Sequence, residues 1–504
     1  MARAHRICRG WTPLLTIGFT CVVALRSAAQ QPVARDTVVL SLPALVTVAL
    51  RNNIDLRLAA LAPQFAAADL QSARGGFDPS FVVGTELGTQ ASDVLGVSPR
   101  STQTSNAGTA ALGALFPIGS QLALQLRNRR VSLDPFVASP TLPFQTSHAS
   151  SLNLSLTQPL LRGFGRGGTY GYVDAAALSV DAARSRYDRS VGVTVALVER
   201  AYWTLRQSES NESVVQQSVD AARAIAERNV ALRARDVATS LDVLTSERGL
   251  ATRETQLWDA TRQRMDAASR LLFLVYGEEA RDGILQDTPR VHTSRDSVIV
   301  PVIPSLDAAD AEALSQRTDV AAAAREVAAG RRRVEQARSQ RRPKLDLIAS
   351  YGYGGTAPSA SFLSYRESGD LRNATWSVGF STSLFLRNDA ASAVDQREVS
   401  LLESATLVRL ATENAVRSDV RIALRALQTG RDRFLRSRDV VRLAEQEYAA
   451  AREGARLGLV TTFQLLQYEE QLAQARLLLA QTRFALEDAG TQYRLAVGDR
   501  GTTR

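Results

Sequence analysis

The chain has 504 residues, of which 45% are hydrophobic, 22% charged and 6% aromatic, and its formal net charge at pH 7 is +9. The arginines that carry this charge are spread among Asp and Glu along helical patterns, without a basic cluster interleaved with aromatic side chains. This distribution favours a solvated helix surface over a nucleic-acid interface. Both cysteines, Cys8 and Cys21, lie near the N-terminus, so the rest of the chain offers no disulfide and no cysteine nucleophile.

The N-terminal segment has the pattern of a secretory signal peptide. Three arginines precede an apolar run from Leu14 to Leu25, and the small residues Ser27, Ala28 and Ala29 follow. The run is shorter than the roughly 20 apolar residues that a membrane-spanning helix needs. We therefore predict a signal peptide at residues 1–29 and export of the mature chain.

Beyond this segment the sequence contains an internal duplication. Ala49–Leu56 (ALRNNIDL) is echoed 264 residues later by Ala313–Val320 (ALSQRTDV), and Thr239–Leu244 (TSLDVL) is echoed 222 residues later by Thr461–Leu466 (TTFQLL). A duplicated unit decides the architecture of a chain. The predicted units are a first structural repeat at 30–276, a linker at 277–304 and a second structural repeat at 305–504.

Each repeat contains segments that alternate between apolar and small polar residues. Leu152–Thr157 and Trp376–Ser381 show this pattern, as do Phe81–Leu87 and Leu345–Tyr351. It suits strands with lipid on one face and an aqueous lumen on the other, although a soluble sandwich gives similar alternation. The export signal and the position of the strands between long helices favour the membrane. The predicted strand pairs lie at about 79–160 and about 343–386.

Only a closed barrel leaves no unpaired strand edge in a bilayer. Four strands cannot close a pore alone, so several chains must contribute to one barrel.

The first strand pair encloses an additional alternating run, Leu122–Arg127, just after Phe116–Gly119. We interpret residues 91–147 as an elaborate extracellular hairpin. The alternative is an added strand pair within the barrel, which the rule of even strand numbers permits.

Each repeat closes with a long helical hairpin. Residues 390–456 contain no proline, and apolar or small residues recur there at alternating steps of three and four, which is the seam of a coiled coil. Ala175–Ala234 and Thr239–Tyr276 repeat the pattern. The seam residues of the second hairpin include Val420, Ala423, Leu427, Phe434, Val441, Ala444 and Ala451, and then Leu465, Tyr468, Leu472, Ala475, Leu486 and Ala489.

The order of these motifs resembles the TolC-like family of outer membrane efflux proteins. The resemblance is carried by Leu40–Leu45 (LSLPAL) with Ala49–Asn53 (ALRNN), by Gln158–Gly163 (QPLLRG) and by Gly458–Thr462 (GLVTT). It covers nearly all of the mature sequence.

The resemblance implies a mixed α and β membrane protein. Three chains would form a homotrimer, each adding about four strands to one β-barrel in outer membrane lipid. The helices would continue as a coiled-coil tunnel through the periplasm, with an equatorial belt from the mature N-terminus, the linker around Ser297–Val300 and the C-terminus. Such a duct exports substrates passively for a tripartite efflux or type I secretion system, joined to an inner membrane transporter by a periplasmic membrane fusion (adaptor) protein.

The sequence does not indicate an enzyme, a cofactor or a metal site. His148 and His292 lie in different loop regions, and no glycine-rich phosphate loop precedes a helix with a lysine. Met265 is the only internal methionine, which argues against a methionine-lined copper path. A periplasmic coiled-coil adaptor or structural protein without a pore is the alternative function, because it would share the helices and the export signal. The duplicated strand pairs favour the duct.

Two groups of residues are candidate site residues. The hairpin tips, Arg235, Asp236 and Val237 with Leu457, Gly458 and Leu459, are expected to meet the adaptor, and Gly458 to end its helix in the left-handed conformation. In the family, acidic residues after the tip motif surround the closed periplasmic end.

The equivalent aperture positions in this chain are Asp242 and Thr245 in the first repeat, and Gln464 and Gln467 in the second. Asp242 and Gln464 also lie three residues after a threonine, so both are equally well explained as capping-box partners at a helix start.

Overall fold

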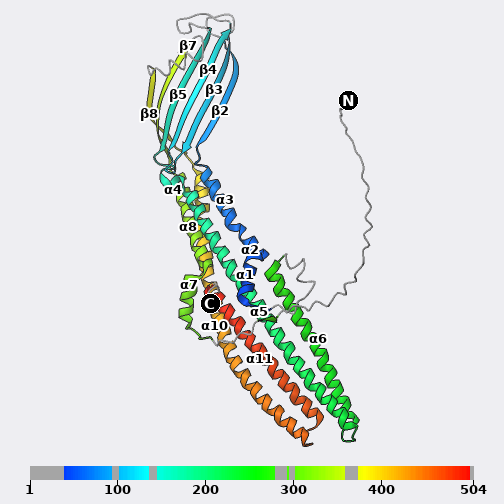
Figure 1. Ribbon diagram of the computed structural model, residues 1–504. Helices are drawn as coiled ribbons and strands as arrows, with labels where there is room; N and C mark the ends of the chain where they lie inside the picture. Colours follow the sequence, from blue (N-terminus) through cyan, green and yellow to red (C-terminus); the bar gives the residue numbers. More distant parts are fainter. Residues whose placement is uncertain are drawn as a thin grey trace, which may run out of the picture.

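The computed structural model describes residues 39–92, 101–134, 145–277, 292–293, 301–357 and 373–499. The predicted signal peptide and Ser297–Val300 of the linker lie outside these ranges. An elongated helical body carries a curved β-sheet at one end, and the helical hairpin tips lie at the other end (Figure 1). The first half contains β1 (Val39–Leu40), α1 (Leu42–Asn52), α2 (Ile54–Ala59), α3 (Leu61–Gly75), β2 (Ser80–Ser92), β3 (Ser101–Leu115), β4 (Gln121–Asp134), β5 (Thr146–Pro159), α4 (Gly165–Thr169), α5 (Gly171–Arg233) and α6 (Ser240–Tyr276). The second half contains β6 (His292–Thr293), α7 (Leu306–Gln316), α8 (Thr318–Gln340), β7 (Lys344–Ala357), β8 (Ala374–Ser383), α10 (Asp389–Arg456) and α11 (Thr462–Val497).

The internal duplication predicted from the sequence is confirmed in the structure. Helix α7 begins and ends 264 residues after α1, and α11 begins 222 residues after α6. The break between α1 and α2 falls at Asn53, whose side chain donates to the Leu274 carbonyl at 3.0 Å. The equivalent break falls at Arg317, which donates to the carbonyl of Ala496, the counterpart of Leu274, at 3.5 Å. Both repeats therefore tie the short first helix to the end of the long hairpin.

The two longest helices determine the length of the molecule. Helices α5 and α10 contain 63 and 68 residues, so they extend about 95 and about 100 Å. Helix α5 packs against α6, α8 and α11, while α10 packs against α11 and α8. The small and apolar residues on the seams are buried, as the spacing of three and four residues predicts. The buried seam residues of the second hairpin include Val420, Ala423, Leu427, Phe434, Val441, Ala444, Leu472, Ala475, Leu486 and Ala489.

Within the described ranges no helix is both long enough and apolar enough to cross a membrane.

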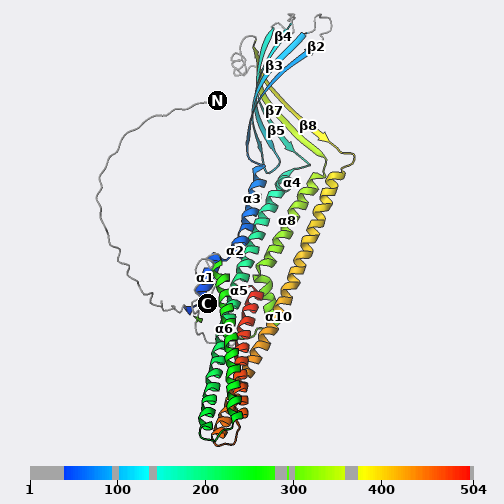
Figure 2. The ribbon, with the colours of Figure 1, turned by 90° about the vertical axis from the view of Figure 1, so that its right-hand side faces the viewer.

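Short elements pack beside the middle of the helical body. Strands β1 and β6 form a two-stranded parallel sheet that joins the N-terminal segment to the linker. Helix α7 packs against α10 and α11, where Ala309 and Ala313 are fully buried against Val416 and Val420. In Figure 2 α1 and the described C-terminal end lie at this level of the body.

The sheet has six strands in one antiparallel order, β2-β3-β4-β5-β7-β8. The expectation of about four strands per chain, with residues 91–147 as an extracellular hairpin, is therefore wrong, and the alternative of an added strand pair is what the sheet contains. Strands β3 and β4 are 15 and 14 residues long, and β4 pairs with β3 along its whole length. The sequence signal of β3 is weak because most of its residues on the face shared with Leu122, Leu124 and Leu126 of β4 are small or polar. The alternation between apolar and polar residues that identifies a strand is therefore almost lost.

The turn between β3 and β4 anchors the added hairpin to the helical body. Gly165 donates its backbone N–H to the Ile118 carbonyl at 3.1 Å. Gly119 has a φ of +94°, and a side chain there would meet the carbonyl of Gly163. Only glycine tolerates both the left-handed backbone and this close approach. The β3–β4 turn therefore lies at the helical end of the sheet, and both strands of the hairpin extend from this turn away from the helical body.

Candidate functional site at the hairpin tips

The two hairpin tips, 234–239 and 457–461, end in equivalent backbone conformations. Gly458 has a φ of +74°, the left-handed conformation expected for a residue that follows a helix. The equivalent residue of the first repeat is Asp236, whose φ is +58°. Aspartate is one of the few residues with a side chain that visits this conformation regularly. The duplication therefore preserves the turn geometry while glycine is replaced by a charged residue.

Large apolar side chains surround both tips. Val237 and Leu241 are 71% and 72% exposed, and their counterparts Leu459 and Phe463 are 78% and 61% exposed. Leu457 is also exposed. Sequence analysis identified Val237, Leu457 and Leu459 but missed Leu241 and Phe463, which the 222-residue spacing could have revealed as a matched pair. The tips thus present an apolar patch, defined by these five residues, at the end of the helical body that is farthest from the sheet (Figure 1).

The aperture candidates Asp242 and Gln464 both act as helix caps. Asp242 Oδ2 accepts hydrogen bonds from the Thr239 backbone N–H at 3.0 Å and the Thr239 hydroxyl at 2.6 Å. Gln464 accepts the same two bonds from Thr461 at 3.0 and 3.1 Å. These reciprocal capping boxes stabilise the starts of α6 and α11. Thr245 is half-buried and Gln467 is exposed, and neither side chain hydrogen-bonds to the cap residues.

The Asp242 carboxylate is held in its charged form. Hydrogen bonds from the side chain and backbone of Thr239 lower the pKa of Asp242 below its usual range, and Thr462 adds a smaller contribution. Because the folded-state pKa is depressed, the stabilisation by this cap is present above the ordinary aspartate pKa. It is lost only as the pH falls through the lowered value. The carboxylate is therefore charged throughout the physiological range.

The tip of one hairpin is fixed to the tip of the other. The Asn229 amide donates to the Asp242 carbonyl and to the Thr462 hydroxyl, both at 3.4 Å. Arg228 donates to the Ala455 carbonyl at 3.0 Å. An apolar cluster of Ile225, Ala451, Leu465 and Leu466 lies beside these contacts.

A buried ion pair joins the hairpins just above this cluster. Arg253 of α6 contacts Glu469 of α11 at 2.6 Å, and their side chains are only 8% and 5% exposed. Arg253 also donates to the Ser218 hydroxyl of α5 at 3.0 Å and to the Leu466 carbonyl. One guanidinium therefore connects three helices. Sequence analysis missed this pair and placed the exposed Tyr468, rather than Glu469, on the buried seam.

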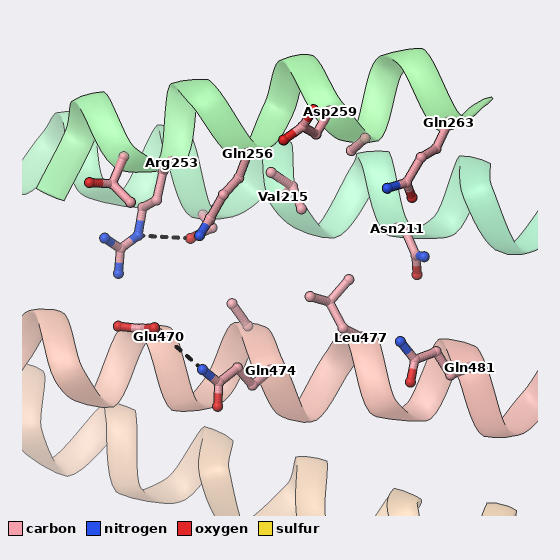
Figure 3. A pocket seen from close by; sticks show the side chains of 14 residues that line it. Asn211, Val215, Arg253, Gln256, Asp259, Gln263, Glu470, Gln474, Leu477 and Gln481 are labelled. Carbon is pink, nitrogen blue, oxygen red and sulfur yellow. Dashed lines mark hydrogen bonds between the residues drawn. The ribbon is translucent and has the colours of Figure 1, made fainter. Parts of the chain in front are cut away.

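Beyond the ion pair the hairpins are separated by a polar groove between α5, α6 and α11 (Figure 3). Gln256 and Gln263 of α6 lie across it from Gln474 and Gln481 of α11, each pair seven residues apart. Polar side chains gain little from burial unless they are hydrogen-bonded. Near the tips, the firm attachment between the hairpins is therefore the ion pair and the apolar cluster below it. Beyond the groove, Glu199 of α5 accepts hydrogen bonds from Thr491 and Arg494 of α11 at 2.8 and 2.6 Å.

The described residues contain no cluster of three or more His, Cys, Asp or Glu side chains that could hold a metal ion. What the tip geometry offers is a rigid pair of helix turns with an apolar outer patch and a charged cap.

The comparisons with known proteins agree with this architecture. The family model described as outer membrane efflux protein matches residues 45–275 and 311–499. The fold is similar to the outer-membrane channel OprN, with 18% identity, a TM-score of 0.65 and coverage of 91% of this chain and 89% of that one. It is also similar to the CmeC outer membrane channel of Campylobacter jejuni, with 15% identity, a TM-score of 0.63 and coverage of 91% and 85%. The open state of the MtrE outer membrane channel of Neisseria gonorrhoeae gives 15% identity, a TM-score of 0.62 and coverage of 92% and 91%. No curated protein matches the chain.

Proposed function

The chain belongs to the outer membrane efflux protein family, and from this premise we propose that three copies close one outer membrane barrel and one periplasmic helical tunnel for passive export. The protein is an outer membrane channel with a large periplasmic helical part, not an enzyme. The observation that supports the trimer is the open sheet, whose edge strands β2 and β8 have no partner within the described chain. Such edges are not tolerated in hydrocarbon, so β8 of one chain would pair with β2 of the next.

The faces of the sheet support this arrangement. Leu122, Leu124 and Leu126 of β4 lie opposite Leu156, Leu154 and Leu152 of β5, and all six point to the same face. On the edge strand β8, Trp376, Val378 and Phe380 are 61–76% exposed. An apolar face of this kind suits contact with lipid, while the other face carries mostly small and polar residues. A sheet with one lipid-facing apolar face is not expected in a periplasmic adaptor without a pore.

The partners at the other end would be a periplasmic adaptor and, through it, an inner membrane transporter. The apolar patch at the tips supports this proposal, because exposed apolar clusters on a polar helical body mark interaction sites. The transporter would select the substrate, since a passive duct needs only to admit it.

A disulfide cross-link between edge strands tests the trimer. Val82 of β2 and Ser377 and Ser381 of β8 all lie on the lumen face, opposite the leucines. We expect Val82→Cys combined in turn with Ser377→Cys or Ser381→Cys to give covalent dimers and trimers on non-reducing gels of outer membranes. The matched control pairs Val82→Cys with Ser155→Cys, an interior strand position on the same face.

The proposal fails if no register on β8 cross-links to β2, or if the control pair cross-links equally well. A protein that fractionates away from the outer membrane would also contradict it.

The aperture role of Asp242 is tested by ion selectivity in planar bilayers. Three Asp242 carboxylates around a threefold axis would favour cation entry. We expect Asp242→Asn to lower the cation preference while keeping the cap, because the amide oxygen still accepts from Thr239. Conversely, Gln464→Glu at the duplicated position should raise the preference. If neither variant changes it, Asp242 is a helix cap alone.

A further inference from the structure

The added β3–β4 hairpin forms part of the sheet, and among the described strands it contributes three arginines that form no ion pair. Strand β4 pairs with β3 on one side and with β5 on the other, so it separates β2 and β3 from β5, β7 and β8. It carries three arginines, Arg127, Arg129 and Arg130. Because side chains alternate between the faces of a strand, Arg127 and Arg129 lie on the face opposite Leu122, Leu124 and Leu126, whereas Arg130 shares the leucine face.

Arg127 lies on a row of small side chains. Its partners in register are Thr109 on β3 and Ser151 on β5, and these pair in turn with Gly84 on β2 and Gly354 on β7. In the part of the chain that the structure describes, neither Arg127 nor Arg129 forms an ion pair. Small neighbours leave the lumen open, so the guanidinium groups can extend into it.

The other charges on this face do not cancel the arginines. Glu86 of β2 lies in register with Arg129, with Ala107 of β3 between them. The Cα atoms of Glu86 and Arg129 are therefore about 10 Å apart, which is two strand spacings. Lys344 and Asp346 form an ion pair at 3.1 Å at the helical end of β7. Among the described strands the lumen face therefore has an excess positive charge in its outer half.

The position of the arginines along the strand follows from the turn at residues 116–120. This turn contacts the helical body, so β4 runs outward from Gln121 to Asp134 (Figure 1). Arg127 and Arg129 lie past the three leucines of the apolar band, toward the exterior. In a trimer they would form two adjacent rings of three arginines each, beginning at the midpoint of β4, and we call the lumen from this level outward the outer mouth.

We propose that the β3–β4 hairpin makes the outer mouth of the channel a wide passage lined by arginines that favours anionic solutes, namely those with carboxylate or phosphate groups. This inference rests on the proposed trimeric channel. Three six-stranded sheets would close a barrel of 18 strands, about 36 Å across between backbones, compared with about 24 Å for 12 strands. Guanidinium groups bind carboxylate and phosphate in a bidentate manner, and rings of arginine select anions in pores.

The local potential can be measured with a single cysteine next to Arg127. Thr109→Cys places a thiol on the lumen face of the adjacent strand, directly in register with Arg127. The rates of its modification by anionic and cationic methanethiosulfonates, measured on intact trimers in outer membrane vesicles, report the sign of the potential there. We compare the ratio of the anionic to the cationic modification rate at this cysteine with the same ratio for a free thiol in solution. At low salt we expect the ratio at the cysteine to be about fivefold higher, and we expect this preference to decrease at 1 M salt.

Three charge variants complete the test. Arg127→Gln with Arg129→Gln should abolish the anionic preference, and Arg127→Lys with Arg129→Lys should retain it. The matched control, Arg130→Gln, lies on the same strand but on the lipid face and should leave it unchanged. An anionic preference that survives the double glutamine variant, or is absent from the parent, would overturn the arginine mouth. Absence of trimers would overturn the proposed function instead, so the two failures are distinguishable.

Discussion

Arg253→Ala is expected to loosen the contact between the two hairpins of one chain by about 3–5 kcal/mol, because it leaves the Glu469 carboxylate buried without a partner. The same substitution removes the bonds to the Ser218 hydroxyl and the Leu466 carbonyl. Hydrogen exchange of the purified trimer should therefore become faster by 100-fold or more in α11 around Glu469, since each 1.4 kcal/mol is about tenfold in an equilibrium constant.

The chain offers a matched control in Arg223 and Glu254. This ion pair also joins two long helices, at 3.2 Å, but its side chains are 51% and 46% exposed. Exposed pairs contribute at most about 1 kcal/mol, so Arg223→Ala should change exchange by no more than a few fold. Replacement of both buried partners, Arg253→Met with Glu469→Leu, should recover most of the protection because no buried charge is left. Equal effects of the two arginine substitutions would contradict a special role for the buried pair.

The helical part of the fold could be predicted from the sequence because its signal is repeated. Steps of three and four residues recur from Val420 to Ala451 of α10 and along α11, and the same pattern occurs in both repeats. The duplication also predicts cap positions, since Thr239 and Thr461 begin α6 and α11 with the same capping box. Errors at single residues are therefore averaged out along each helix.

The strand number and the buried pair could not be predicted for a common reason. Both depend on residues whose local pattern is neutral. Strand β3 carries Gly108, Ala110 and Ala114 where a lipid-facing strand would ordinarily show large apolar residues, so only its pairing with β2 and β4 identifies it. The Arg253–Glu469 contact joins residues 216 positions apart, and no local spacing indicates it. Tertiary pairing carries the missing information in each case.

The tip patch combines both kinds of information. Val237 and Leu459 occupy equivalent positions of the two repeats, and the structure places the tips together through Asn229 and the cluster around Leu465. Apolar residues retained at equivalent exposed positions are not needed to form either turn, because the turns depend on Asp236 and Gly458. The proposed external partner, contacting both tips, would account for their exposure.

Leu457→Asp with Leu459→Asp is therefore expected to abolish export while leaving trimer abundance unchanged. The two side chains are 68% and 78% exposed, so the substitution removes no internal contact of consequence. Burial of a leucine against a partner contributes about 1.5–3 kcal/mol. Loss of two such contacts, with two charges added to the interface, should weaken docking by at least about 100-fold. The measurement is the rate of substrate export in the native cell, with trimers quantified by heat-modifiable gel mobility.

Val302→Asp is the matched control, because Val302 is 93% exposed but lies in the linker at the middle of the body rather than at a tip. It should export at the parental rate. Val237→Asp, on the first-repeat tip, should reduce export by an intermediate factor, since it removes one apolar contact of the five in the patch. Channel conductance of all three variants in planar bilayers should match the parent, because the barrel and tunnel are unaltered. If the double aspartate variant exports normally at normal trimer abundance, the tips are plain turns and the adaptor must bind elsewhere on the helical body.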